Sequence, residues 1–351
     1  MKKISKLLVG ILFSALVVAP SYAGEMTVTG SAKASYVTNG ASGSGGKTIG
    51  ISNELDFTAS GELDNGYTWK YQVQIDDQDA GNDDTRLEIG TDMGTIGIYQ
   101  SEGGISSELA HGIGALGTGF DYASPATFQK GYDVDGYSNL QYHTPAGLLP
   151  FGVGIKVAYA PNMQTGDGMS YKGAVATPTT QSEGRDMQMA QVKMAPIDGL
   201  SIQGSVAEVA SVAGDANRDD GISANVGAKY TMGQFSVGYT EGGYQPATGA
   251  TANDETIYYE SKFYGIQFDV SDALSISYNV DESTKNTRTA VAEVGGTKGT
   301  KTTLAMEQES IQLAYTVGGA TIGIADIDVT NSDYTSGKTE TMTVVSLAID
   351  F

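Results

Sequence analysis

Most of this chain alternates between apolar and hydrophilic residues with a period of two. In the segment 27–36, Val28 and Tyr36 share one side with small residues, whereas Thr29 and Lys33 fall on the other. Successive side chains of an extended strand point to opposite faces, so this pattern predicts a β-strand with one apolar and one hydrophilic face. The pattern returns in the segment 49–60 and in later segments, which makes β structure the expectation for the whole chain.

We count sixteen candidate strands between residue 27 and residue 351. Their parity is unclear in 186–195 and in 303–317, where we expect a bulge or a displaced boundary. The connections alternate between short links, such as 318–319, and long ones, such as 101–137. Tight turns on one rim and longer loops on the other are typical of outer-membrane barrels, whose short turns are periplasmic and whose long loops are extracellular.

The two faces of the expected strands differ in a way that argues against a soluble sandwich. The apolar face is mixed with glycine and alanine, and tyrosine outnumbers phenylalanine 20 to 9. The opposite face is rich in Ser, Thr, Gln, Lys and Asp, which cannot form a dry core, so a water-filled interior is its simplest location. Beyond the N-terminal segment no run of about 18 apolar residues exists, and only a closed barrel could then span a membrane. The predicted fold is an all-β transmembrane antiparallel barrel.

The first 23 residues have the pattern of a signal peptide. Three lysines precede the apolar stretch 7–19, and the small residues Ser21 and Ala23 follow at the positions that signal peptidase inspects. We therefore predict a cleaved signal peptide, 1–23, and a barrel domain, 24–351.

Charge and composition exclude several partners. Removal of the three signal-peptide lysines would leave 17 basic against 41 acidic residues, a formal charge of −24. Such an acidic chain lacks the clustered Lys and Arg that nucleic acid requires. The sequence contains no cysteine, so disulfides and thiolate metal sites are excluded.

Three stretches carry a resemblance to a known family. Residues 54–69 and 89–99 resemble an early hairpin and a later strand-turn-strand of the general porins of alphaproteobacteria. The tail is similar to the signal that the barrel-assembly machinery recognises, since its apolar residues alternate up to the last one: Val345, Leu347, Ile349 and Phe351. The resemblance implies a homotrimer of sixteen-stranded barrels in the outer membrane of a Gram-negative bacterium. It also implies membrane lipid, the assembly machinery and periplasmic chaperones as partners, and passive diffusion of small hydrophilic solutes as the function.

In such porins the third extracellular loop folds into the lumen and narrows it. The matching segment here is 101–137, the longest connection, with a single lysine and five acids: Glu102, Glu108, Asp121, Asp133 and Asp135. A long solvated outer loop is the alternative.

The alternation of strand faces places six basic residues on the inward face: Lys33, Lys70, Arg86, Lys156, Lys193 and Lys229. Opposed charges across a constriction create a transverse field, and the excess of carboxylate predicts weak cation selectivity. Each base could equally be a separate solvated charge.

One acidic segment suggests a metal. Five aspartates gather at the loop that follows the third strand: Asp76, Asp77, Asp79, Asp83 and Asp84. Clustered carboxylates are ligands for Ca²⁺, although the spacing does not fit an EF-hand. A solvated loop or a subunit contact explains the same residues, and no other cofactor is expected.

Other functions find less support in the sequence. Only two histidines exist, His111 and His143, and no nucleophile elbow or phosphate-binding loop appears, so we do not expect an enzyme. A substrate-preferring channel and a non-conducting structural or adhesive surface barrel remain as alternatives.

Overall fold

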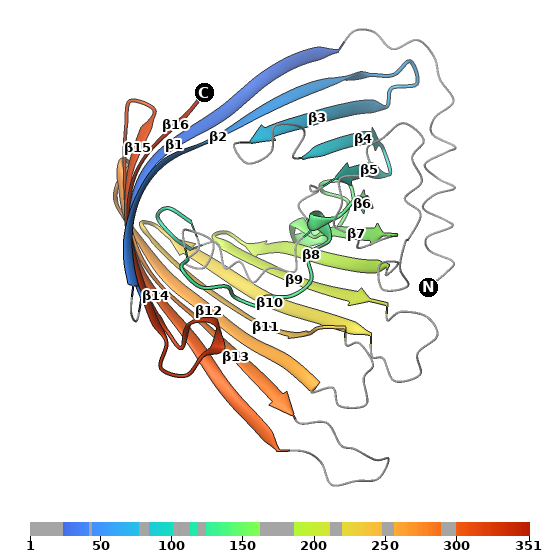
Figure 1. Ribbon diagram of the computed structural model, residues 1–351. Helices are drawn as coiled ribbons and strands as arrows, with labels where there is room; N and C mark the ends of the chain where they lie inside the picture. Colours follow the sequence, from blue (N-terminus) through green and yellow to red (C-terminus); the bar gives the residue numbers. More distant parts are fainter. Residues whose placement is uncertain are drawn as a thin grey trace, which may run out of the picture.

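The computed structural model describes residues 24–41, 44–76, 84–100, 105, 113–117, 124–161, 186–210, 220–247, 256–288 and 300–351. Sixteen antiparallel strands form one closed barrel in which each strand pairs with its neighbours in sequence and β1 pairs with β16 (Figure 1). Among the described residues, no helix has the length and apolar character needed to cross a membrane.

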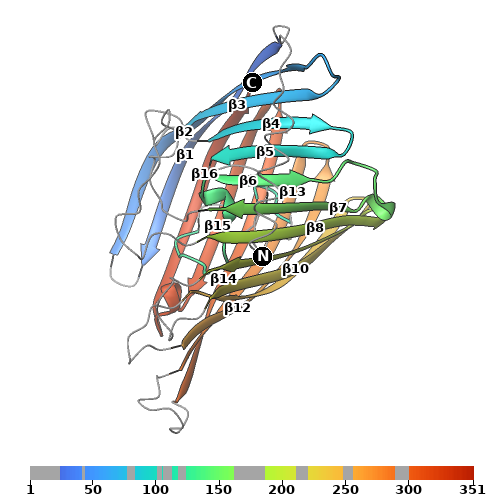
Figure 2. The ribbon, with the colours of Figure 1, turned by 90° about the vertical axis from the view of Figure 1, so that its right-hand side faces the viewer.

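The strands follow one another around the barrel in chain order (Figure 2). Their bounds are β1 Glu25–Ala41, β2 Ser44–Glu62, β3 Thr68–Asp76, β4 Thr85–Thr91, β5 Gly94–Gln100, β6 Asn139–His143, β7 Gly154–Ala160, β8 Met187–Ile197, β9 Leu200–Val209, β10 Gly221–Met232, β11 Phe235–Gln245, β12 Thr256–Ser271, β13 Leu274–Arg288, β14 Lys301–Val317, β15 Ala320–Thr330 and β16 Thr339–Asp350. Within the residues that the structure describes, three short 3-10 turns lie between them: η1 Val134–Gly136, η2 Pro150–Gly152 and η4 Ser332–Tyr334.

Closure of the barrel joins its first and last strands. Val37 pairs with Val344 and Lys33 with Ala348. Beyond the end of β16, Gly30 N donates to the Phe351 carbonyl at 2.8 Å and Phe351 N donates to the Gly30 carbonyl at 2.9 Å. A closed ladder leaves no edge strand, which is the condition for placing a sheet in lipid.

The predicted alternation of faces is confirmed by the register. On the outside, Ile51 of β2 is 70% exposed, and Leu347 of β16 is 44% exposed. On the inside, Ser277 and Gln312 face each other across β13 and β14 and are buried. The apolar residues therefore surround the barrel, and the hydrophilic ones line its interior.

The outer apolar surface ends at tyrosines. Tyr239 and Tyr264 are cross-strand partners on β11 and β12 and both are exposed. Tyr239 donates its hydroxyl proton to Glu241, and Tyr278 donates to Glu309, at 2.8 and 2.9 Å. Each ring thus joins apolar surface to an acidic residue nearer the rim of the long loops, as in an aromatic girdle.

The predicted alternation of turns is confirmed as well. On one rim, five connections contain only two residues: 92–93, 198–199, 233–234, 272–273 and 318–319. The prediction of a long loop near 39–47 is wrong, since β1 runs to Ala41 and β2 starts at Ser44. This Gly- and Ser-rich segment lacks apolar alternation, yet backbone pairing needs no apolar side chain, and Asn39 pairs with Gly46.

The two segments of unclear parity have different causes. The register of β8 with β9 shifts between Met194 and Ile197, which confirms an irregularity at the end of 186–195. In 303–317 the pairing of β14 is regular on both sides. Its parity is obscured because Met306 is apolar yet faces inward.

Within the part of the chain that the structure describes, two apolar clusters lie inside the barrel. One contains wall residues such as Phe263, Met306 and Ile327 together with Ala126 and Phe128 from the 101–137 connection. The other joins Ile105 and Val134 of that connection to Met187, Met189 and neighbouring residues of β7–β9. Apolar residues on an inward face thus mark where the connection packs against the wall.

Candidate functional site

The 101–137 connection, here called the inner loop, lies against the inward face of β12–β14 in its segment 113–117. Ala115 N donates to Ser277 Oγ, and Leu116 N donates to Gln312 Oε1, both at 2.8 Å. Ile113 is completely buried. Because these partners are inward-facing wall residues, this part of the inner loop occupies the interior of the barrel, where it is drawn in green in Figure 1.

The second half of the inner loop is bound to the wall at two further places. Ser124 Oγ donates to Gln308 Oε1 at 2.6 Å. Tyr132 N donates to Ser223 Oγ at 3.1 Å, and the Tyr132 hydroxyl accepts from Ala247 N at 2.6 Å. Contacts to β10, to β14 and to the segment just after β11 draw this part of the loop across the interior.

Two of the five predicted loop acids lie in the described residues, on either side of the first residue of η1. Asp133 Oδ1 accepts from Asp135 N at 3.0 Å, which is a cap on η1. Asp135 Oδ1 accepts from Gln141 Nε2 of β6 at 3.3 Å. The loop therefore presents a carboxylate to the wall at β6. Glu102, Glu108 and Asp121 lie outside the described residues.

The wall opposite η1 is a connected polar network. Gln72 on β3 accepts from Arg86 on β4, and Gln72 Nε2 donates to Asp56 Oδ1 at 2.7 Å. The Tyr99 hydroxyl donates to Glu88 Oε1 at 3.1 Å. These bonds tie charged side chains of β2–β5 into one surface.

The network continues to β6 through an aromatic contact. The Tyr99 ring stacks on His143 with centroids 5.8 Å apart, and His143 Nε2 shares a hydrogen bond of 2.7 Å with Gln141 Oε1. Gly97, on the same face, lets this ring lie flat, since a Cβ there would come within 2.6 Å of it.

All six predicted basic residues are on inward-facing positions, but they do not form one ring. The charges of Lys193, Asp135 and Glu88 act on the Lys156 ammonium, as does the charge of Arg86. Arg86, Lys156 and Lys193 therefore form one group of bases, which is accompanied by the carboxylates of Asp135 and Glu88. Register places Lys70 opposite Glu88 on β4, beside this network. The other two lie elsewhere: Lys33 opposite Ser52 on β2, and Lys229 opposite Ser201 on β9.

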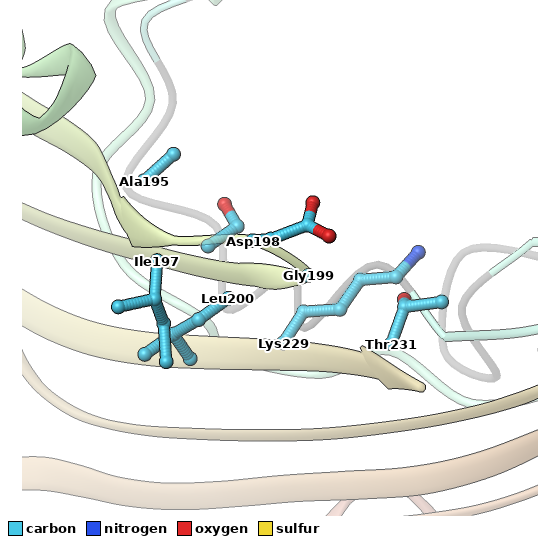
Figure 3. A pocket seen from close by; sticks show the side chains of 8 residues that line it. Ala195, Ile197, Asp198, Gly199, Leu200, Lys229 and Thr231 are labelled. Atoms are coloured by element: carbon cyan, nitrogen blue, oxygen red, sulfur yellow. The ribbon is translucent and has the colours of Figure 1, made fainter. Parts of the chain in front are cut away.

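Lys229 lines a separate pocket at the rim of the short turns. The pocket has a volume of about 410 Å³ and is bordered by the β8–β9 turn. In Figure 3 the Lys229 side chain extends past Asp198 and Gly199 of that turn toward Thr231. Lys229 and Asp198 would therefore contact a solute at the short-turn end of the passage and not within the charged network of the wall.

Sequence reasoning missed the uncharged members of the network. Gln72, Tyr99 and Gln141 carry no charge, so a search for opposed charges passes over them. Their inward parity was available from the sequence, but which inward residues meet the inner loop depends on how that loop folds.

The predicted Ca²⁺ site is only partly within the described residues. Asp76 ends β3 and Asp84 precedes β4, with Gln74 N donating to the Asp84 carbonyl at 2.8 Å. Asp77, Asp79 and Asp83 lie outside the described residues, as does His111. Within the described residues no group of three or more His, Cys, Asp or Glu side chains is arranged to hold a metal. Calcium binding stays a prediction.

The predicted assembly residues share the outer face of the last strand. Val345, Leu347 and Ile349 are 43%, 44% and 46% exposed, and Phe351 is 65% exposed. Their role in assembly stays a prediction.

The fold is shared with solved porin structures. No protein-family model and no curated protein matches the sequence. The chain is similar to a loop L8 deletion mutant of OmpT, an outer membrane protein of Vibrio cholerae, with a TM-score of 0.62 and 12% identity over 93% of this chain and 99% of that one. An anion-selective porin from Comamonas acidovorans gives a TM-score of 0.61 and 14% identity over 93% and 100%. Salmonella typhi OmpF gives 0.59 and 11% over 94% and 98%. At these identities the likeness establishes a porin-type barrel fold; the alphaproteobacterial type rests on the sequence resemblance alone.

Proposed function

We propose that this chain forms a water-filled pore in the outer membrane of a Gram-negative bacterium, through which small hydrophilic solutes and ions diffuse passively. The observation that carries this proposal is the charged network of β2–β7 facing the inner loop inside a closed barrel. Charged side chains in a packed interior would cost several kcal/mol each, whereas a hydrated passage accommodates them. The exposed apolar outer face and its tyrosine boundary fit lipid.

Single-channel recording in planar bilayers tests the pore. Purified, refolded protein should give stepwise current increases. Absence of current from a heat-resistant, folded barrel would contradict the proposal and favour a structural or adhesive surface barrel. Hydrolysis of a chromogenic ester by the same preparation would revive the enzyme alternative.

We propose weak cation selectivity as the finer property of this pore. The formal charge of −24 after signal-peptide removal supports it. Near Lys156, the charges of Arg86 and Lys193 are accompanied by the carboxylates of Asp135 and Glu88. The fold alone does not decide the sign, since a structure with the same fold is described as an anion-selective porin. A reversal potential under a salt gradient measures it, and an anion-favouring value would contradict it.

We further propose a homotrimer. One structure similar to this chain is described as the trimer form of Vibrio cholerae OmpT, with a TM-score of 0.60. Current steps in groups of three, together with the mass of the detergent-solubilised complex, test the subunit number.

A solute that binds preferentially in the pore would block the current in a concentration-dependent way. This measurement distinguishes a substrate-preferring channel from a general one.

A further inference from the structure

The connection between β15 and β16, here called the β15–β16 turn, comprises residues 331–338 and is attached to the inside of the wall. Its 3-10 turn η4 packs on β14. Asn331 Nδ2 donates to the Ala305 carbonyl at 2.8 Å, and the Tyr334 hydroxyl shares a hydrogen bond of 2.7 Å with Ser283 Oγ. Ser283 faces inward and is completely buried, so Tyr334 reaches into the barrel.

The same turn holds the inner loop. Thr127 N donates to Asp333 Oδ1 at 3.2 Å, and Gln129 N donates to the Tyr334 hydroxyl at 3.1 Å. Between these two residues Phe128 packs edge-on against Phe263 of the wall, with ring centroids 5.5 Å apart. Tyr334 is thus bonded to the wall and to the inner loop through one oxygen atom.

An aromatic series on the wall continues this contact. The Tyr334 ring lies 5.2 Å from Tyr259, which stacks on Tyr244 at 5.7 Å. Tyr244 in turn meets Tyr132 of the inner loop edge-on at 5.1 Å. The β15–β16 turn and the inner loop are therefore joined both directly and through β11 and β12.

The backbone of the turn is in an unusual conformation. Asn331, Asp333 and Tyr334 all have left-handed φ values, of 52°, 50° and 54°. Such values are uncommon outside glycine and persist where surrounding contacts determine them. Here Lys338 Nζ bridges Asp333 at 2.6 Å and Glu340 at 3.0 Å, and Ser332 Oγ donates to Glu340 at 2.6 Å.

Closure of the barrel does not require these contacts. Thr330 and Thr339 already pair, and the ladder of β15 with β14 and β16 is regular. A shorter turn would connect the same two strands. The inward bend and its left-handed residues therefore serve something other than strand pairing.

We propose that Asp333 and Tyr334 are positioning residues that fix the segment 124–130 of the inner loop in the interior and so set the width of the passage. The proposal rests on the pore function proposed above. With the turn in place, the segment is held between Ser124 on one side and Tyr132 on the other. Without it, the middle of the segment loses the acceptors for Thr127 N and Gln129 N.

The first experiment measures position directly and does not depend on conduction. Tyr334→Phe keeps the ring and removes the hydroxyl, and Asp333→Ala removes the other acceptor. Amide hydrogen exchange in a peptide covering 124–130 should become roughly fivefold faster in each variant, the factor expected for one lost hydrogen bond. Ser336→Ala, an exposed position in the same turn, is the matched control and should not change it. Unchanged exchange in both variants would overturn the proposal.

The second experiment measures how the loss of these contacts affects conduction through the pore. In bilayers, Tyr334→Phe and Asp333→Ala should show larger current fluctuations and additional conductance levels, whereas Ser336→Ala should match the unaltered protein.

A cross-link tests the same contact in the opposite direction. The sequence has no cysteine, so Thr127→Cys combined with Asp333→Cys provides a specific cross-link. The oxidised pair should have a steady current, and its reduction should restore the fluctuations. If the variants exchange faster but conduct as the unaltered protein does, the width assignment fails and the pore function stands. Loss of current from the unaltered barrel would contradict the pore function instead.

Discussion

Two buried asparagines on β13 differ sharply in their hydrogen bonds. Asn286 is 1% exposed, donates to Glu260 Oε2 at 3.1 Å and accepts from Thr303 Oγ1 at 3.0 Å. Asn279 is completely buried beneath Ile113 of the inner loop, and neither its Oδ1 nor its Nδ2 has a hydrogen-bond partner among the described residues. A buried amide without partners costs about 1–3 kcal/mol, whereas a bonded one contributes to stability. The same residue type therefore has opposite effects on two parts of one strand.

This contrast gives a stability prediction. Asn279→Leu should raise the urea concentration at which the barrel unfolds, by the equivalent of about 1 kcal/mol, because it removes unsatisfied polar atoms at similar volume. The matched variant Asn286→Leu should lower it, because it leaves Glu260 and Thr303 without their partner. Fluorescence of Trp69 and gel mobility of unheated samples monitor unfolding. Equal shifts in the two variants would contradict the argument.

Asp135 is the described loop carboxylate that reaches the wall. Asp135→Asn should keep the bond from Gln141, since an amide oxygen still accepts, while it removes one negative charge beside Lys156. We expect the reversal potential to move toward anions with little change in conductance. Asp198→Asn, at the pocket of the short-turn rim, is the control and should have a smaller effect. An equal or larger shift in the control would place the selective region at that rim.

At the scale of elements, the stability of the β15–β16 turn depends on the ion pair between Asp333 and Lys338. A hydrogen bond from Lys338 holds the pKa of the Asp333 carboxyl below its usual range, and the same contact raises the pKa of Lys338. Because this pKa is depressed, ionised Asp333 stabilises the folded turn at every pH above the ordinary carboxyl pKa of about 3.9. The stabilisation is lost as the pH falls through the depressed pKa.

The turn should therefore be insensitive to mild acid. After correction for intrinsic rates, hydrogen exchange in 124–130 should be the same at pH 7 and pH 5 and faster below about pH 4, near the ordinary carboxyl value. In Asp333→Asn the acid step should disappear. A step between pH 5 and pH 7 would indicate a different group, since the carboxyl of Asp333 is fully ionised in that window.

Element by element, the sequence predicted strands better than connections. Alternating apolar residues located strands such as 221–232 with their observed bounds, because lipid and water act on opposite faces. The end of β1 and the extension of β13 to Arg288 carry no such pattern, since both lie toward the long-loop rim, where neither face needs to be apolar. The inward position of the 331–338 turn could not be predicted either, because it depends on contacts with a loop two hundred residues away, such as that between Gln129 and Tyr334.

For the whole molecule, the sequence predicted closure, strand number and face but not the grouping of charges. Parity places Lys33, Arg86 and Lys229 alike on the inside. Only the three-dimensional arrangement separates Arg86, in the network with Gln72, from Lys229, at the pocket of the rim. Height along a tilted strand and the course of the inner loop decide this grouping, and neither leaves a periodic signal.

The overall charge leads to a last prediction. If selectivity arises from the summed charge of the passage, it must decrease as salt screens that charge, since the Debye length falls from about 10 Å at 0.1 M to about 3 Å at 1 M. The reversal potential at a fixed salt ratio should therefore shrink as both concentrations rise, with cations favoured at the low end. A preference that stays constant across this range would point to direct contact of the ion with a few side chains, with Asp135 the first to substitute. At low salt a distant net charge is least screened, so a preference for anions there would mean that Arg86, Lys156 and Lys193 dominate the field even against the acidic excess.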